Sequence, residues 1–193
     1  MLTLGACTGG GDPPSPTTPV VTGTATGAST TATSTRDPST AAATTAAPTP
    51  SVDPVLAKIP AAARPETPEG AEAFAKFYIG QLNAALSLAD PAQVKGLFTE
   101  DCKGCTAFLQ SAEKMKSNGQ RHAGETLTVT DTSVISFVDL RKEIQVDATQ
   151  NAVPVIDASG TKLRTTTADQ GSFVLTLTYR SHWVVERQQV MAP

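Results

Sequence analysis

The hydrophobic residues of this chain recur first with the spacing of helices and later with the spacing of strands. A helix is predicted to begin at Thr67-Pro68-Glu69, because Thr is a good N-cap, Pro suits the first helical position, and a carboxylate favours the positive end of a helix. Apolar residues then follow at intervals of three and four, which predicts one buried stripe. The stripe consists of Phe74, Tyr78, Leu82, Ala85 and Leu86.

Two further helices are predicted before residue 120. Asp90-Pro91 repeats the cap-and-proline signal and predicts a short second helix. A third helix is predicted to end at Asn118-Gly119, a typical stop signal. The apolar residues are Val94, Leu97 and Phe98 in the second helix, and Phe108, Leu109, Ala112 and Met115 in the third.

Beyond Glu125 the apolar residues alternate with polar ones, as in half-buried strands. Segments 153–157 and 162–166 are predicted to pair around a turn at 157–160, and a last strand is predicted from Trp183 to Val190. Strands this close in sequence pair mostly antiparallel. The inward sets are Leu127, Val129, Ile135 and Phe137; Ile144, Val146 and Ala148; and Phe173, Leu175, Leu177 and Tyr179. The predicted fold class is α+β, with N-terminal helices packed on one face of a curved, mostly antiparallel sheet.

Composition separates this region from the N-terminal part of the chain. There is no aromatic residue between Thr8 and Pro65, and Thr, Ala, Ser, Gly and Pro dominate from Thr17 to Thr49. Such a segment has too little apolar area to offset the entropy of ordering. We therefore predict a disordered linker over residues 8–54 and a single folded domain over residues 55–193.

The first seven residues carry a candidate lipid-attachment signal. Leu4-Gly5-Ala6-Cys7 resembles a bacterial lipobox, in which the Cys thiol is diacylated after the preceding residues are removed. Only six residues precede Cys7, and none is Lys or Arg, whereas an export signal needs a positive start and an apolar stretch. Residues 1–7 are thus interpreted as the remnant of a signal that begins upstream, the alternative being a chance Cys in a disordered tail. Lipidation places the protein on the outer face of the cell membrane.

Charge excludes some partners. The net charge of −3 over 193 residues is small, and the charged residues are scattered. Without a basic stripe, nucleic acid is not an expected partner. The expected partners are the membrane, through the lipid, and a small apolar ligand or an envelope protein.

The other two cysteines, Cys102 and Cys105, form a CxxC pair. In an exported protein such a pair is expected to be oxidised to a disulfide. A thioredoxin-like redox site is the first alternative, but no βαβ pattern surrounds the pair. A zinc half-site is the second, and His122 and His182 are distant in sequence. The prediction is a structural disulfide, with no metal and no cofactor.

Several of these residues together resemble a known family. Ile59-Pro60, Pro65-Glu66-Thr67, Gly70-Ala71, Phe74 and Cys102-Lys103-Gly104-Cys105 are similar to a family of actinobacterial lipoproteins of unknown function. The order of helices and strands resembles the cone of nuclear-transport-factor-2-like proteins. The resemblance implies a lipid-anchored envelope protein with a cone-like fold, and it carries no functional residues over to this chain.

Cone-like folds enclose a pocket between helices and sheet. The candidate pocket-lining residues are Tyr78, Asp131, Ser133 and Tyr179, because they share the inward register of their elements. A buried Asp beside two Tyr has the groups for acid–base chemistry. The alternative places Asp131 and Ser133 at an exposed bulge and both Tyr in the core. No catalytic residue is assigned, and His182 and Trp183 receive no functional role.

Two classes of function remain. The first is a lipid-anchored extracytoplasmic binding or accessory module. The second is a small cofactor-independent lyase or isomerase that uses the cone pocket, and a CxxC redox protein ranks third. The pocket discriminates between the first two, because an enzyme needs convergent polar groups in an enclosed apolar cavity.

Overall fold

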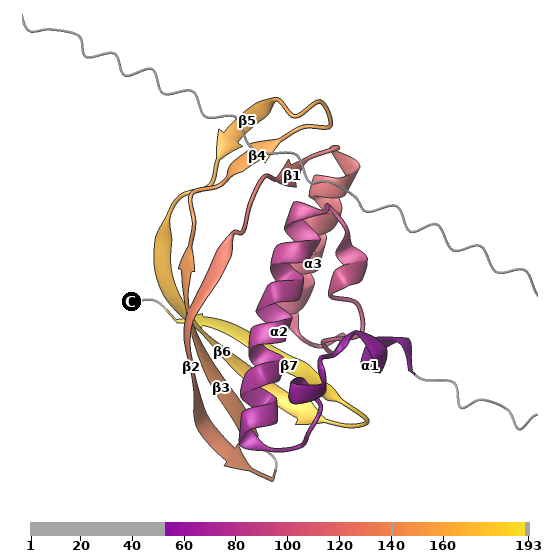
Figure 1. Ribbon diagram of the computed structural model, residues 1–193, viewed down its shortest axis with the longest axis vertical. Coiled ribbons are helices and arrows are strands. Elements are labelled where there is room, and N and C mark those ends of the chain that lie inside the picture. Colours follow the sequence, from indigo (N-terminus) through magenta and orange to yellow (C-terminus); the bar gives the residue numbers. More distant parts are fainter. Residues whose placement is uncertain (1–52, 140, 192–193) are drawn as a thin grey trace, which may run out of the picture. The chain divides into compact units, whose positions relative to one another are not determined.

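The computed structural model describes residues 53–139 and 141–191, which form helices packed on antiparallel strands (Figure 1). The α-helices are α1 Pro54–Lys58, α2 Pro68–Ser87 and α3 Lys103–Ser117, and the 3₁₀ turns are η1 Ala61–Ala63 and η2 Pro91–Gln93. The strands are β1 Arg121–His122, β2 Leu127–Val138, β3 Arg141–Gln150, β4 Pro154–Ile156, β5 Lys162–Thr165, β6 Asp169–Tyr179 and β7 Trp183–Met191. The predicted α+β class is confirmed.

The predicted long helix is α2, and it begins where its capping signal lies. The hydroxyl of Thr67 accepts a hydrogen bond from the Gly70 amide at 3.1 Å, and Pro68 is the first helical residue. The predicted apolar stripe is buried along the helix. The buried residues of α2 are Gly70, Ala71, Phe74, Ala75, Tyr78, Ile79, Leu82, Ala85 and Leu86.

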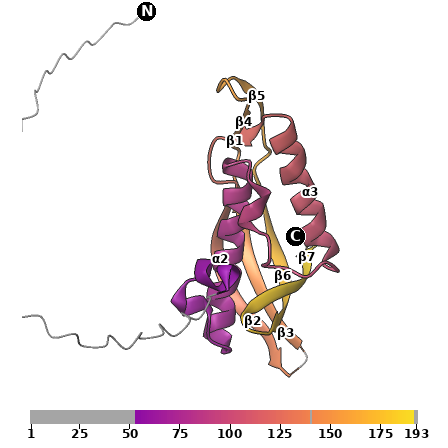
Figure 2. The ribbon, with the colours of Figure 1, turned by 90° about the vertical axis from the view of Figure 1, so that its right-hand side faces the viewer.

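The strands form two antiparallel sheets. The larger sheet has the order β2-β3-β6-β7, and the smaller has the order β1-β4-β5. Helices α2 and α3 lie on one side of the curved larger sheet, as Figure 2 shows after a quarter turn. The predicted β4–β5 hairpin is confirmed, and the Asp157 carboxylate fixes its turn by accepting from the Ser159 and Thr161 amides, each at 2.9 Å.

The core lies between α2 and the inward side of the larger sheet. Two of the three predicted inward sets, on β3 and β6, face it as expected. Ile144 lies opposite Leu175, and both are fully buried. Trp183, at the start of β7, is the largest fully buried side chain. The helices therefore cover the apolar side of the larger sheet, as the sequence predicts.

The predicted second helix is wrong. Only η2 follows the Asp90 cap, and the chain then becomes extended at Phe98, which makes an isolated parallel bridge with Val185. The Thr99 amide donates to the Val185 carbonyl, and the Val185 amide donates to the Leu97 carbonyl, both at 2.9 Å. Local capping signals cannot reveal this pairing, because its partner strand lies almost ninety residues away.

The N-terminal boundary also needs a small correction. The predicted linker includes Asp53 and Pro54, but Asp53 caps α1 by accepting from the Val55 amide at 2.8 Å, and Pro54 opens the helix. Cys7 and the rest of the predicted linker lie outside the described residues. Their predictions therefore stay predictions.

Candidate functional site

A cavity of about 770 Å³ lies between the two long helices and the strand ends. Its wall is mainly apolar at the level of α2, α3 and the larger sheet. The apolar lining residues are Leu82, Leu86, Phe108, Met115, Leu127, Phe173 and Val190. A concave apolar space of this volume is typical of small-molecule sites.

One buried polar group in the lining is His122, on β1. The His122 ring is buried, and its Nδ1 lies 2.6 Å from the Thr126 hydroxyl, which also lines the cavity. Burial is the main cause that lowers the pKa of His122, and the positive charge of Arg164 lowers it further. The imidazole is therefore neutral at pH 7, with Thr126 holding its orientation.

Sequence reasoning missed His122. In the sequence analysis, His122 is considered only as a metal ligand that would pair with Cys102 and Cys105. The one feature of the sequence that could have pointed to His122 is its spacing from Thr126, which follows it by four residues and directly precedes β2. That spacing alone does not reveal a cavity.

Asp131 and Ser133 do not point into the cavity, so the prediction that they line it is wrong. The β2–β3 register shifts between Val129 and Asp131, which is a β-bulge. One extra residue reverses the alternation, so Asp131 and Ser133 are exposed, while Thr132 and Val134 lie opposite buried Val146 and Ile144. The alternative interpretation, an exposed bulge, is the correct one.

A second register shift, between Val134 and Ser136, places the other predicted inward residue, Ile135, half exposed. Phe137 returns to the inner side and packs edge-on against Trp183, with 6.1 Å between ring centroids. The two bulges thus preserve the core at both ends of β2 and expose its middle polar residues.

Tyr78 and Tyr179 are core residues and do not line the cavity. Tyr78 is fully buried, and its hydroxyl donates to Gln188 Oε1 at 3.0 Å. Burial raises the pKa of the Tyr78 hydroxyl, which keeps it protonated as a donor. Tyr179 packs edge-on against Trp183, with 4.9 Å between ring centroids. The proposed group of one Asp and two Tyr does not converge.

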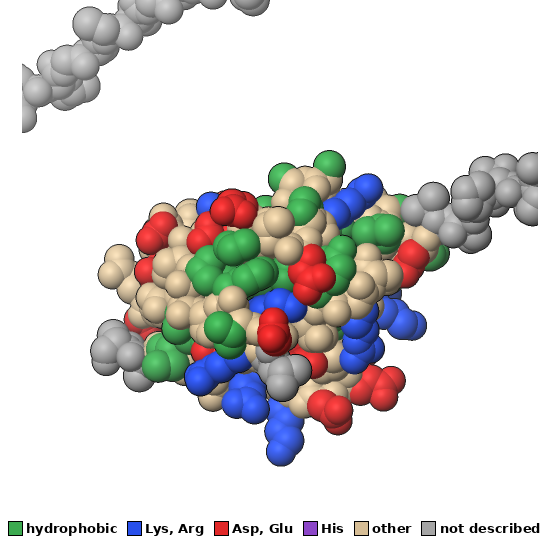
Figure 3. All heavy atoms as spheres, turned by 90° about the horizontal axis from the view of Figure 1, so that it is seen from below, with side chains coloured by type: hydrophobic (Ala, Val, Ile, Leu, Met, Phe, Trp, Pro, Cys, Tyr) green, Lys and Arg blue, Asp and Glu red, His purple; other side chains and the backbone are tan. Residues whose placement is uncertain are grey.

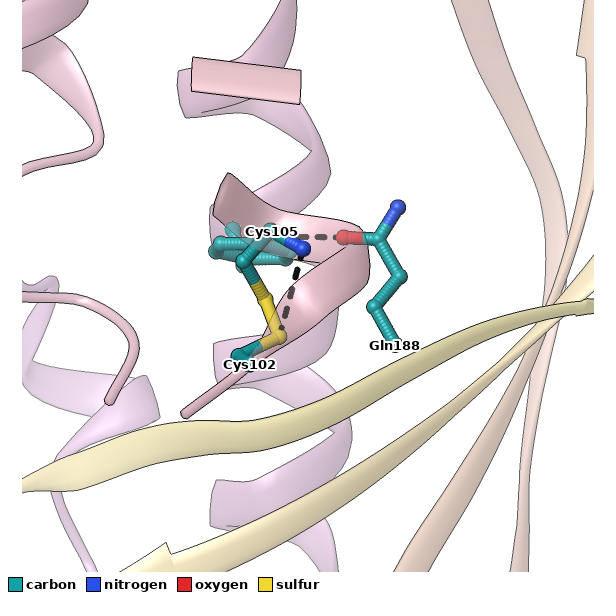
Figure 4. Close-up of a disulfide and its surroundings, with 4 residues drawn as sticks. Cys102, Cys105 and Gln188 are labelled. Atoms are coloured by element: carbon teal, nitrogen blue, oxygen red, sulfur yellow. Dashed lines mark hydrogen bonds between the residues drawn. A yellow bond between two sulfur atoms is a disulfide. The ribbon is translucent and has the colours of Figure 1, made fainter. Parts of the chain in front are cut away.

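Gln188 connects the core to the cavity. It lies on the inner side of β7, lines the cavity, and accepts the Tyr78 hydrogen bond (Figure 4). The same view shows that Gln188 extends toward the first turn of α3, where the cysteine pair lies. Tyr78 therefore supports the cavity wall indirectly.

Cys102 and Cys105 form a disulfide, with their Cα atoms 5.3 Å apart. Cys102 is the N-cap of α3, and its sulfur accepts from the Cys105 amide at 3.3 Å (Figure 4). Each residue is only 1% exposed. Thiol–disulfide exchange requires access for an attacking thiolate, so this burial favours the structural role over the redox one.

Gly104, between the two cysteines, is an ordinary helical residue of α3. Strand β7 leaves no room for a side chain at Gly104, because a Cβ at this position would lie 2.6 Å from the Gln188 carbonyl oxygen. The first turn of α3 thus lies against β7 at the same place where Gln188 enters the cavity. The disulfide and this close approach together position α3.

We expect Cys102→Ser to lower the melting temperature and leave the strands folded. Loss of a bridge that closes so small a loop costs about 2 kcal/mol on the loop-entropy view. Thermal unfolding followed by circular dichroism at strand wavelengths measures the effect, with wild type in non-reducing buffer as the control. A mature exported protein with free thiols at both positions, together with insulin reduction, would overturn the structural role.

Residues 53–139 and 141–191 bring together no cluster of three His, Cys, Asp or Glu suited to a metal ion. Within the same residues, no helix combines the length and apolarity needed to cross a bilayer.

The fold and the cavity define an α+β domain with an apolar site that opens to solvent. Residues 39–189 match the model of a family described as "Family of unknown function (DUF6318)", and the chain belongs to this family. No curated protein matches the chain.

One solved structure, from Novosphingobium aromaticivorans, is described as a "putative aromatic ring hydroxylase". It is 13% identical to this chain, covers 66% of this chain and 93% of its own, and has a TM-score of 0.46.

Proposed function

We propose that this protein is a lipid-anchored, extracytoplasmic binding module of the cell envelope, whose cavity takes a small apolar ligand. The observation that carries the binding function is the 770 Å³ cavity, with seven apolar side chains in its wall. The anchor rests on the lipobox-like sequence at Cys7 and on the Thr- and Ala-rich segment that follows it.

The binding function is favoured over the lyase or isomerase alternative by the polar groups of the cavity. Asp131 is exposed, and both Tyr78 and Tyr179 belong to the core. In the described cavity wall, His122, held by Thr126, is the uncharged side chain with the chemistry of a general base. A single base without a matched acid supports binding better than catalysis.

The binding function is tested with a neutral apolar dye such as N-phenyl-1-naphthylamine, whose fluorescence rises in an apolar site. Ser111 is exposed on α3 and lines the cavity, so Ser111→Phe should fill the entrance without disturbing the core. We expect dye affinity to fall about tenfold, which corresponds to ~1.4 kcal/mol.

Gln110→Phe is the matched control for this experiment, because Gln110 is an exposed neighbour on the same helix that does not line the cavity. It should bind the dye like the wild type. Equal affinity of both variants, or no dye binding by the wild type, would contradict the proposed site.

The anchor is tested separately. Expressed with a complete export signal upstream, the protein should partition into the detergent phase, and Cys7→Ser should remain in the aqueous phase because the acyl-carrying thiol is gone. Thr8→Ala, next to the attachment site, is the control and should still partition. Unchanged detergent partitioning of Cys7→Ser would refute lipidation.

A further inference from the structure

The cavity is elongated along α3. Its lining includes Gly104 in the first turn of the helix and Met115 near its last turn. These residues are eleven positions apart, so at 1.5 Å per residue the cavity follows the helix for about 16 Å. The apolar side chains Phe108 and Leu82 lie along this length. Such a space suits a chain-like apolar ligand better than a compact one.

The end of the cavity near the smaller sheet is cationic. Lys114, in the last turn of α3, and Arg164, on β5, both line it. Arg164 Nη1 donates to the Gln120 side-chain oxygen at 3.4 Å, which links the cation to the segment before β1. Figure 1 shows that the end of α3 lies beside β1, β4 and β5, so these residues from distant parts of the chain share one end.

No carboxylate balances these cations in the described part of the cavity wall. Within residues 53–139 and 141–191, the lining contains Lys114 and Arg164 but no Asp or Glu. Neither cation has a carboxylate within 4.0 Å in that part of the chain. The nearby Asp157 carboxylate accepts hydrogen bonds from its own turn instead. The positive charge of Arg164 is also felt at His122, whose pKa it lowers.

The opposite end of the domain differs. Viewed from below, the end that carries the β2–β3 hairpin exposes hydrophobic side chains among charges of both signs (Figure 3). There Lys142 is paired with Glu66, with 2.7 Å between Nζ and Oε1. At the β2–β3 end a carboxylate thus neutralises Lys142, whereas the described cavity wall has no carboxylate beside Lys114 and Arg164.

We propose that the cavity binds a single-chain amphiphile, with its apolar chain along α3 and its anionic head group at Lys114 and Arg164. This inference rests on the proposed binding function and names its ligand class. Gln120 and His122 add uncharged polar groups beside the head-group position. The anionic head is a carboxylate or a phosphate, since both accept hydrogen bonds from a guanidinium.

The test measures binding of four twelve-carbon probes to the full chain by displacement of the neutral dye: dodecanoate, dodecyl phosphate, dodecanol and dodecyltrimethylammonium. All are used below their micelle-forming concentrations. We expect both anionic probes to bind about tenfold more tightly than dodecanol, and dodecyltrimethylammonium to bind most weakly. Comparison of dodecanoate with dodecyl phosphate tells which head group is preferred.

Arg164→Gln should remove most of the preference for anions while dodecanol affinity stays within about twofold. Arg180→Gln is the matched control, because it removes the same charge from an exposed site that does not line this cavity. It should behave as the wild type. Circular dichroism of each variant establishes that the fold is retained.

A second readout uses the two histidines of the chain. Bound anion near Arg164 should raise the pKa of His122 in an NMR titration, and dodecanol should not. The His182 ring, which does not line the cavity, should show no ligand-dependent change in chemical shift.

The possible outcomes separate the two proposals. Equal affinities for anionic, neutral and cationic probes would overturn the amphiphile proposal and leave the apolar site intact. The same holds if Arg164→Gln and Arg180→Gln weaken anion binding equally. Failure of every probe and of the dye to bind would instead overturn the proposed binding function.

Discussion

Gly70→Ala should destabilise the domain by about 3 kcal/mol, which lowers the melting temperature of a domain of this size by roughly 10 °C. A Cβ at Gly70 would overlap the carbonyl of Pro65. That carbonyl also accepts the Trp183 indole N–H at 2.9 Å, and the Gly70 amide donates to the Thr67 cap at 3.1 Å. Any backbone shift that relieves the overlap therefore strains a cap and a core hydrogen bond together.

The matched control for Gly70→Ala is Gly80→Ala in the same helix. A Cβ at Gly80 meets nothing within 4 Å, and Gly80 is exposed. Because Ala has the higher helix propensity, Gly80→Ala should stabilise the domain by about 0.5–1 kcal/mol. Urea denaturation followed by circular dichroism measures both changes. Equal effects of the two substitutions would contradict the close approach of Pro65 to Gly70.

Trp183→Ala should cost about 3–5 kcal/mol, as large aromatic deletions in cores do. Trp183 is fully buried, and Tyr179 and Phe137 pack edge-on against it. Lys142 Nζ lies 5.6 Å from the centroid of the same ring. The deletion removes the contact that joins the start of β7 to β3 and to the segment before α2.

Two companion variants make the Trp183 prediction specific. Trp183→Phe keeps an aromatic ring but removes the donor to the Pro65 carbonyl, so its cost should be smaller, about 1–2 kcal/mol. Val138→Ala changes a side chain on the same sheet that is 61% exposed, and it should cost less than about 0.5 kcal/mol. Trp183 is the only tryptophan, so its variants lack tryptophan fluorescence as a signal of unfolding. Unfolding is therefore followed by circular dichroism. A cost for Trp183→Ala below that of Trp183→Phe would refute the packing described.

Where sequence reasoning succeeded, the signal was local. The start of α2 follows from Thr67 and Pro68, whose capping chemistry acts within a few residues. The strand at Phe173 to Tyr179 follows from a strict alternation, because one of its sides is buried. The same reasoning failed in β2, where bulges shift the alternation and moved Asp131 and Ser133 to the outside.

The sequence by itself determined the α+β class, the start of α2, the end of α3 and the β4–β5 hairpin, because capping, apolar periodicity and turn chemistry are properties of neighbouring residues. Only the tertiary structure decided the candidate site. It joined His122, Lys114, Arg164 and Gln188 in one cavity wall from four different elements. The parallel bridge at Phe98 and the approach of β7 to Gly104 depend on partners far along the chain. The register shifts of β2 depend on how this strand pairs with β3. The alternation of residues within one strand encodes neither.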